Sequence, residues 1–429
     1  MALDIDSLAP PAAALSAPPS LLRWSVVFLT SCMLGVVLML LLWPKNLPTA
    51  TALFWTTVIG IPAIASAVVV VIPLLLRAGA QRDADAWNRA RDVDVQKAFQ
   101  SESRAIALLA GSYRFSLDDE KNDVSNLVSG DLLLVAQPTP DRSAAVEARW
   151  FDAPACAVTE RATTYDATRQ LKALDNVLKK LLDAVTSAIQ TLPGRIPLTV
   201  KLHVAAPLIA DDIEKRFQLA WKVADLRDVA VIHEPVPPGL MSLDRWLDQG
   251  PGPERDHATL LVVIQLHRLV SKSPPKGCAE AGVALLTIPE DLARRNGLQS
   301  KARIFRPREG TIATLAETLK FALTWGAAES DTVGHLWHTG FDMVGQRALL
   351  SATKSVGLPS TTERQPPGAH NLDRMLGHAG AAADWFALAC ACEYADAFGG
   401  PQLVATHDGR HASISVVRPT DRPTLHKSL

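Results

Sequence analysis

Two histidines next to glycines are the best candidates for chemistry in this chain, His338 and His378. His338-Thr339-Gly340 follows an apolar run and precedes a helical pattern, and 40 residues later Leu376-Gly377-His378-Ala379-Gly380 begins a second, apolar helix. Imidazoles can act as general acids or bases, but covalent catalysis also needs a nucleophile. The question is therefore which residue could serve as that nucleophile.

The five cysteines give no clear answer. They are scattered, odd in number and typical of a reducing compartment: Cys32, Cys156, Cys278, Cys390 and Cys392. Cys390 and Cys392 are two residues apart on a predicted helix, where buried thiols are the ordinary interpretation. Cys156 is the only thiol in the first half of the soluble region, but no clear amphipathic helix follows it.

Other catalytic signatures are missing. The chain has no GxxxxGK[ST], GxGxxG, HExxH or GxSxG motif and no CxxC pair for zinc. His407 and His411 flank a predicted hairpin turn, so they do not share a helix face. His335 and His338 point to opposite faces of a predicted strand. We therefore expect no metal and no cofactor.

The elements that position these residues alternate between strands and helices. Leucines and other apolar residues at three- and four-residue spacing predict a helix over Tyr165–Leu192, which Pro193-Gly194 ends. The other predicted helices are Ile209–Val223, Thr311–Thr324, Gly345–Val356 and Ala381–Phe398. The predicted strands are Ala105–Leu109, Leu132–Ala136, Ile196–Val204, Val229–His233, Thr259–Leu266, Ala281–Ile288, Val333–Trp337, Gln402–Thr406 and Ala412–Val417. The pattern predicts a layered α/β/α domain.

The order of these motifs resembles the thiolase-like fold of β-ketoacyl synthases. In that family a strand ends in an HGTGT-type loop, a GH…GAA loop begins a helix, and two strands close the chain; here the loops are His338–Gly340 and Leu376–Ala382. The run Glu280–Leu286 (EAGVALL) is similar to the family's EGAGALLL segment. The resemblance covers roughly residues 165 to 418.

This sequence departs from the family where the chemistry is demanding. A ketosynthase needs a thiolate at a helix N-terminus, where the helix dipole lowers its pKa; at the position expected for it, this chain has Ala205-Ala206-Pro207. Asp373 stands where the family has a lysine, and the HGTGT loop is shortened. We therefore interpret His338 and His378 as vestigial or structural and expect no enzyme activity. The alternative is an acyltransferase whose nucleophile is displaced, with Cys156 as the candidate.

The N-terminal region predicts a transmembrane hairpin. Trp24–Trp43 is uncharged, long enough to cross a bilayer and bounded by tryptophans, and Leu53–Leu76 is a second uncharged stretch. A cleavable signal peptide is the alternative for the first stretch, but its apolar core is too long and a second stretch follows directly. Basic residues precede the first stretch and follow the second, so both termini are expected in the cytoplasm.

The predicted organisation has five parts. Residues 1–22 form a disordered cytoplasmic tail, 23–77 the transmembrane hairpin, 78–103 a linker, 104–418 the thiolase-like domain and 419–429 a polar tail. The whole chain has 43 Lys and Arg against 44 Asp and Glu. This balance argues against a nucleic-acid partner.

An anchored, degenerate domain of this kind looks like the type VI secretion lipase adaptor family, in layout and in the closing segment Pro401–Pro419. The resemblance implies a non-catalytic adaptor at the bacterial inner membrane that loads a toxin lipase effector onto a secretion spike. It also implies a homodimer, by analogy of fold. The alternatives are the acyltransferase and a structural membrane protein unrelated to secretion.

Overall fold

The computed structural model describes residues 12, 20–44, 51–130, 132–151, 161–248, 256–358 and 368–420. Cys156 and most of the two expected tails lie outside them. The described residues fall into two compact units, one formed by residues up to 100 and one by residues from 101 onward. We call them the anchor unit and the α/β unit and describe each by itself.

The anchor unit is helical throughout its regular elements. It contains α1 (Leu21–Leu42), α2 (Ala52–Trp55), the π-helix η2 (Thr56–Gly60) and α3 (Ile61–Glu102). Two stretches of helix, Leu22–Leu42 and Ala52–Asp94, are long and apolar enough to cross a membrane. Helix α3 continues through Pro73 into the polar segment without a break. The expected linker is therefore the second half of the same 42-residue helix.

Small residues allow α1 to approach the second helical stretch closely. A Cβ atom added to Gly35 would lie 2.7 Å from the Cβ of Pro62. Trp43 and Phe54 meet edge to face near the connector, with ring centroids 4.9 Å apart. Close backbone approach at small residues is typical of helix pairs in membranes.

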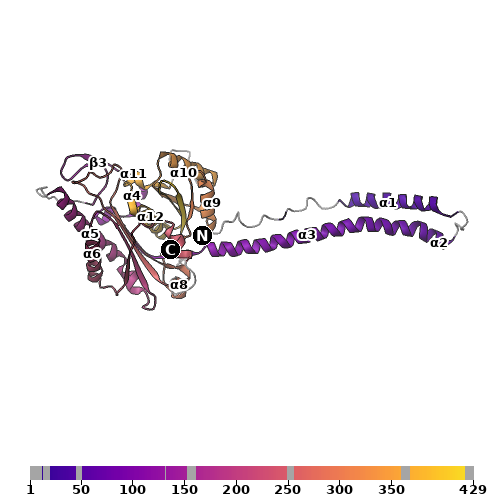
Figure 1. Ribbon diagram of the computed structural model, residues 1–429, viewed down its shortest axis with the longest axis horizontal. Coiled ribbons are helices and arrows are strands. Elements are labelled where there is room, and N and C mark those ends of the chain that lie inside the picture. The colour runs from indigo at the N-terminus through magenta and orange to yellow at the C-terminus, as the bar shows by residue number, and fades with distance from the viewer. Residues whose placement is uncertain are drawn as a thin grey trace, which may run out of the picture. The chain divides into compact units, whose positions relative to one another are not determined.

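The α/β unit is built on one large mixed sheet (Figure 1). A separate two-stranded sheet consists of β2 (Ala136–Pro138) and β3 (Ala145–Glu147). The strands of the large sheet are β1 (Ala105–Arg114), β4 (Leu198–Ala205), β5 (Ala230–His233), β6 (Ala258–Gln265), β7 (Ala281–Pro289), β8 (Ala302–Phe305), β9 (Arg308–Gly310), β10 (His335–Thr339), β11 (Ala369–Asn371), β12 (Gln402–His407) and β13 (Ala412–Pro419).

The large sheet contains the same topology twice. Half 1 (residues 105–289) has the order β5-β4-β6-β7-β1, and half 2 (residues 302–419) has the order β11-β10-β12-β13-β8. Counted along the chain, the strands of half 1 are β1, β4, β5, β6 and β7, and those of half 2 are β8, β10, β11, β12 and β13. In each half the second of these strands is parallel to the third and to the fourth, and the fifth is antiparallel to the fourth and to the first. Antiparallel pairing of β1 with β8 joins the halves.

Helices cover the sheet on both faces. In Figure 1, α5 (Ala162–Thr191) and α6 (Ala210–Val223) lie side by side over half 1. Helices α9 (Leu315–Trp325) and α10 (Met343–Ser355) pack together against half 2. The buried helix α12 (Ala383–Phe398) contacts strands of both halves. The shorter helices are α4 (Val124–Val128), α7 (Ser242–Asp248), α8 (Glu290–Arg295), α11 (Leu372–Met375) and the 3-10 turns η3 (Asp119–Lys121), η4 (Ser330–Thr332) and η5 (Gly380–Ala382).

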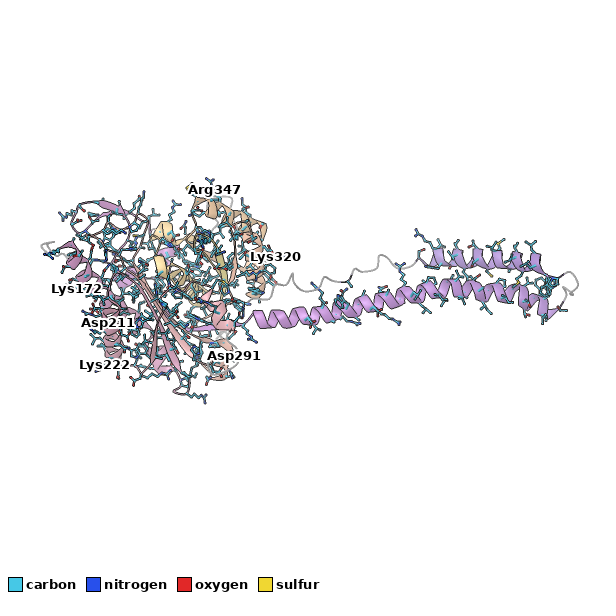
Figure 2. The ribbon with its side chains drawn as sticks, in the orientation of Figure 1. Lys172, Asp211, Lys222, Asp291, Lys320 and Arg347 are labelled. Carbon is cyan, nitrogen blue, oxygen red and sulfur yellow. The ribbon has the colours of Figure 1, made fainter. Side chains whose placement is uncertain are left out.

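Amphipathic periodicity explains which helices lie on the outside. The face of α5 with Leu174, Leu178 and Leu181 is fully buried, while Lys172 and, on α6, Lys222 project outward (Figure 2). Helix α12 differs because most of its residues are buried, as expected for a helix between layers. The unit is therefore layered, with α12 inside and amphipathic helices outside.

The structure corrects several sequence predictions. Residues 132–135 are irregular rather than a strand, and only Ala136 begins β2. The helix predicted from Thr311 begins at Leu315. Helix α7 and strands β8 and β11 are short elements that periodicity did not indicate. The remaining predicted strands and helices are present, with ends shifted by a few residues.

Candidate functional site

The His338 and His378 loops meet at one end of half 2. His338 is in β10, followed by Thr339 and Gly340, and His378 lies in the loop between α11 and η5. The hydroxyl of Thr339 is 3.5 Å from Nδ1 of His378. Within the described residues, no hydrogen bond or ring contact joins the two imidazoles themselves.

Asp373, on α11, connects the two loops. Its carboxylate accepts hydrogen bonds from the Thr339 hydroxyl and the Gly340 N–H, both at 2.6 Å. It also lies 3.2 Å from Nδ1 of His378. The residue that stands in place of the family's lysine therefore holds both loops in position, which the sequence did not indicate.

Hydrogen bonding favours the charged forms of both Asp373 and His378. Burial alone would raise the pKa of Asp373, but hydrogen bonds from His378, Thr339 and Gly340 outweigh it and lower that pKa. The hydrogen bond to Asp373 raises the pKa of His378 in turn. The His378 side chain is 48% exposed, so this half of the site is open to solvent.

His338 is in the opposite state. It is 8% exposed, and burial lowers its pKa to about 4, so it is neutral at pH 7. Its Nδ1 is buried and has no hydrogen-bond partner among the described residues. The edge of its ring packs against Phe341, with centroids 6.1 Å apart. His338 therefore behaves as a packed core histidine.

The space beside these loops is very small. A pocket lined by Phe115, Ala281, Asp373, Gly377 and Phe386 has a volume of about 10 Å³. That is close to the minimum needed to hold one water molecule. In this conformation an acyl chain does not fit beside Asp373.

The backbone of half 1 supports the His378 loop. The N–H of His378 donates to the carbonyl of Gly277 at 2.7 Å, and the N–H of Ala279 donates to the carbonyl of His378 at 2.9 Å. Gly377 has φ +98°, and a Cβ atom there would lie 2.6 Å from the carbonyl oxygen of Cys278. Only glycine fits this joint between the halves.

The thiol nearest to the joint is not activated. Cys278 is 8% exposed, and burial, followed by the charge of Glu280, raises its pKa to about 11. Cys390 and Cys392 lie inside α12, where burial also raises their pKa values. In the described part of the chain, no cysteine occupies the first turn of a helix in the α/β unit. Cys156 lies outside the described residues.

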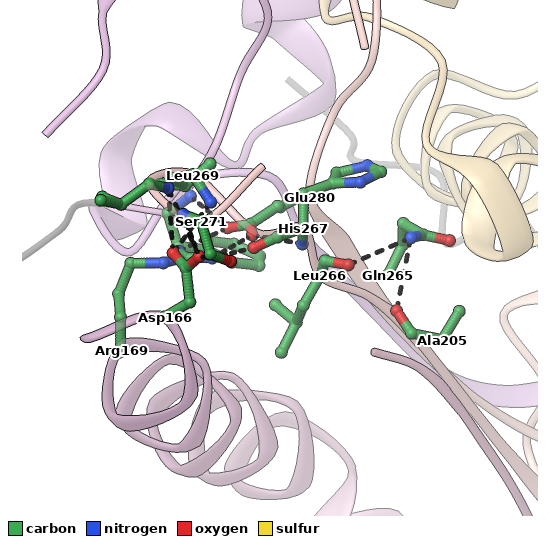
Figure 3. Close-up of polar contacts among 11 residues, drawn as sticks. Asp166, Arg169, Ala205, Gln265, Leu266, His267, Leu269, Ser271 and Glu280 are labelled. Carbon is green, nitrogen blue, oxygen red and sulfur yellow. Dashed lines mark hydrogen bonds and ion pairs between the residues drawn. The ribbon is translucent and has the colours of Figure 1, made fainter. Parts of the chain in front are cut away.

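A buried ion pair fixes the segment that carries this joint (Figure 3). Arg169 on α5 and Glu280 are 1% and 0% exposed and are joined by two hydrogen bonds, of 2.5 and 3.0 Å. Glu280 also accepts from the N–H groups of Phe151 and His267. Each Glu280 oxygen thus has two donors, which is what a buried charge requires.

Asp166, one helical turn before Arg169, holds the loop after β6. Its carboxylate accepts from the N–H groups of Leu269, Val270 and Ser271 and from the Ser271 hydroxyl (Figure 3). The first turns of α5 are therefore tied to both ends of the connection between β6 and β7. These contacts could not be predicted from local sequence pattern, because the partners are about 100 residues apart.

The segment expected to carry a nucleophile lies near the start of α12. Gln265 donates to the carbonyl of Ala205 at 3.3 Å, and its own carbonyl accepts from the N–H of Ala381 at 3.1 Å. Ala205-Ala206-Pro207, between β4 and α6, is the counterpart of the His338 loop between β10 and α10.

The counterpart of the His378 loop is the segment between β5 and α7. The first residue of α7 is Ser242, which is 2% exposed. Its hydroxyl accepts a hydrogen bond from the guanidinium of Arg245 at 2.8 Å. This serine is the only hydroxyl or thiol in residues 234–242.

The other histidines lie in separate surroundings. His335 and His370 stack with centroids 5.0 Å apart, and burial lowers both pKa values, that of His370 to about 4. His407 stacks on Phe341, while His411 follows the hairpin turn. Among the described residues, no group of three or more His, Cys, Asp or Glu side chains could hold a metal.

Sequence comparison gives no relative: no protein-family model and no curated protein matches the chain. Solved structures, in contrast, match the chain. A ketosynthase from module 6 of the bacillaene synthase of Bacillus subtilis covers 74% of this chain and 71% of its own, with 14% identity and a TM-score of 0.51. An oxazolomycin ketosynthase domain from Streptomyces albus covers 75% of each chain, with 13% identity and a TM-score of 0.51. At these identities the likeness concerns the fold alone, and the α/β unit has the mixed α/β, thiolase-like fold of ketosynthases.

Proposed function

We propose that this protein is a membrane-anchored adaptor whose ketosynthase-fold unit binds a protein partner instead of condensing acyl thioesters. The observation that carries the proposal is the pocket of about 10 Å³ beside Asp373. A condensing enzyme must place an acyl chain and a nucleophile there together. In this chain Asp373, Gly377 and apolar side chains such as Phe115 and Phe386 form the wall of that pocket.

The state of the candidate groups agrees with this proposal. The Cys278 thiol has a raised pKa and stays protonated at neutral pH, and a thiol is a poor nucleophile. The Ser242 hydroxyl is buried against Arg245. His338 is neutral and buried, and its Nδ1 has no hydrogen-bond partner among the described residues.

The proposed anchor is the helical hairpin of the anchor unit, in the bacterial inner membrane. Arg23 precedes α1, and Arg77, Arg82, Arg89 and Arg91 follow the apolar part of α3, whereas the connector holds one basic residue, Lys45. The positive-inside rule then places both termini and the α/β unit in the cytoplasm. A reporter enzyme fused after Leu429 should be active only in the cytoplasm; activity in the periplasm would reverse this orientation.

The proposed partners are a toxin lipase effector and the spike of a type VI secretion system. They follow from the resemblance in layout and closing segment to the lipase adaptors of that system. Affinity purification of the full chain, extracted in detergent from its native cell, should recover one stoichiometric lipase. Recovery of no stoichiometric partner at native expression would contradict the adaptor function.

The competing function, an acyltransferase, can be tested directly. The full chain in detergent is offered malonyl- and acyl-thioesters, together with the variants Cys156→Ala and Ser242→Ala. We expect no turnover above that of a heat-denatured sample. Turnover that disappears in either variant would replace the adaptor proposal with an enzyme and would identify its nucleophile.

A further inference from the structure

Arg149, two residues after β3, is a half-buried arginine whose guanidinium has no partner. Among the described residues none of the three guanidinium nitrogens takes part in a hydrogen bond or an ion pair, and Nε is fully buried. The carboxylate of the nearby Glu147 is paired with Lys276 at 3.0 Å. Burial lowers the pKa of Arg149, and no carboxylate opposes that effect. The α/β unit therefore holds a partly desolvated charge without a counter-ion.

Two other arginines of the α/β unit show what burial of a guanidinium normally requires. Arg169 is 1% exposed and is paired with Glu280. Arg306 is 2% exposed, and two carboxylates of α7 lie 2.6 and 2.7 Å from its outer nitrogens. A buried charge that lacks such a partner destabilises the fold. Arg149 has lost part of its water in the same way but has no carboxylate in return.

The guanidinium of Arg149 is held in place and is open at its outer end. The Arg149 N–H donates to the carbonyl of Cys278 at 3.0 Å, and the Arg149 carbonyl accepts from the N–H of Glu280 at 2.8 Å. The guanidinium lies over the buried ring of Phe115, 5.6 Å from its centroid. Its two outer nitrogens are not among the fully buried atoms, so solvent reaches them. They form a planar pair of donors that matches the two oxygens of a carboxylate.

We propose that Arg149 binds a carboxylate of the adaptor's protein partner, an acidic side chain or a C-terminus, through both outer nitrogens. This contact rests on the proposed adaptor function and gives it a location on the α/β unit. A partly desolvated arginine is a common centre of binding energy in protein interfaces. The charge of Arg149 destabilises the free chain and is neutralised in the complex, so some stability is given up for binding.

Chemical modification of arginine tests this contact without a partner. Phenylglyoxal is added to the full chain in detergent micelles, and mass spectrometry follows Arg149 and the exposed Arg347 on α10 (Figure 2) in the same sample. The probe is acetylglutamate amide, whose side chain supplies one carboxylate, and acetylglutamine amide is its neutral match. We expect the carboxylate to protect Arg149 at a concentration at least about tenfold lower than it protects Arg347. Equal protection of the two arginines, or protection of Arg149 by the neutral probe, would overturn the proposal.

Variants connect the contact with the partner. Arg149→Met should raise the midpoint of guanidinium unfolding, because it removes the unpaired charge and leaves a flexible side chain on Phe115. It should also lower the amount of partner recovered from the native cell by about tenfold or more, whereas Arg347→Met should recover as much as the unmodified chain. Arg149→Lys keeps the charge without the planar fork and should recover less than the unmodified chain.

The outcomes separate this contact from the adaptor function. A lower unfolding midpoint in Arg149→Met, or recovery of the same amount of partner, would refute the contact and leave the adaptor function standing. If the unmodified chain recovers no partner, the adaptor function fails and the contact fails with it. Protection of Arg149 by acetylglutamate amide would in that case assign the site to a free carboxylate ligand.

Discussion

The two halves of the α/β unit share a strand order but differ in the helix that packs inside. In half 2 the long helix between β11 and β12 is α12, which has 16 residues and follows the short α11 and the His378 loop. In half 1 the corresponding helix is α7, with seven residues. The two meet where Trp246 of α7 stacks on Trp385 of α12, with centroids 5.8 Å apart.

This difference separates two tasks. Half 2 supplies the side chains of the histidine site, His338, Asp373 and His378. Half 1 supplies backbone groups at Gly277 and Ala279 and the buried pair Arg169–Glu280 that holds them. Both halves thus have the same architecture, but only half 2 contributes the polar side chains of the histidine site. The predictions below test this division, from the largest expected effect to the smallest.

The support from half 1 should dominate stability. Arg169→Met leaves Glu280 charged and buried without its partner, so it should lower the free energy of unfolding by about 3–5 kcal/mol. Replacing both residues, with Arg169→Met and Glu280→Leu, should recover part of that loss because no charge then stays buried. Guanidinium unfolding of the detergent-solubilised full chain, followed by tryptophan fluorescence, measures both values.

The exposed pair Arg216–Asp175 is the matched control. Both side chains are 39% exposed and their atoms are 2.7 Å apart, so Arg216→Met should cost less than about 1 kcal/mol. Equal losses in the two arginine variants would mean that burial of the ion pair is not what makes Arg169 important.

The two histidines of half 2 should respond to pH with opposite signs. The folded pKa of His338 is about 4, below its unfolded value of about 6.5. Between these values only the unfolded chain binds the proton, so stability falls by about 3 kcal/mol as the pH drops from 6.5 to 4. His338→Gln should abolish that part of the slope.

His378 has a raised pKa, so its contribution is fully present below the unfolded value and is lost as the pH rises through the folded value. His378→Gln should therefore remove stability at pH 6 more than at pH 9. Unfolding free energies measured across this range provide the test. Parallel pH profiles for the two variants would contradict the division into a buried neutral and a paired charged histidine.

The joint between the halves should be less costly to break. Gly377→Ala places a Cβ atom against the Cys278 carbonyl at a positive φ, and about 2–3 kcal/mol of stability should be lost. Gly409→Ala is the control: its φ is +93°, but nothing lies within 4 Å of the added atom, so about 1 kcal/mol is expected. The difference between the two losses measures the contact between the halves, and equal losses would exclude it.

Local pattern was enough to predict much of the fold. Helix α5, strand β6 and the β12–β13 hairpin have strong periodicity or a two-residue turn signal, and the structure confirms them. Short elements could not be predicted in this way. Strand β8 has four residues and helix α7 seven, and their conformation depends on partners far away in the sequence.

The candidate site shows the same limit. Glycine spacing drew attention to His338 and His378; the structure places His338 inside β10, not after it, and His378 in the loop before η5. Asp373 was interpreted only as a missing lysine, because its hydrogen bonds depend on two loops whose proximity the sequence does not encode locally. The link between Arg169 and Glu280, 111 residues apart, was not visible for the same reason.

The outer edges of the halves also differ, and this should affect association more than stability. Strand β5 ends half 1 with an exposed edge, on which Ile232 is 46% exposed. Strand β11 ends half 2, and its His370 is 8% exposed and stacks on Trp337. An unpaired, apolar edge strand is where a second copy of the chain can add its own strand. We therefore propose that a second copy of this chain adds its strand at β5 and forms a homodimer there.

Ile232→Lys should raise the dissociation constant of the dimer by about tenfold, which sedimentation of the detergent-solubilised full chain can measure. Its unfolding free energy should change by less than about 0.5 kcal/mol, because the side chain is exposed in the monomer. Val344→Lys on α10, where the valine is 67% exposed, introduces the same charge away from both edges and should leave the dimer intact. If the two lysine variants weaken association equally, general charge repulsion explains the effect and the edge of half 1 has no special role. Dissociation in Ile232→Lys alone would mean that the halves differ at their outer strands as well as in their inner helices.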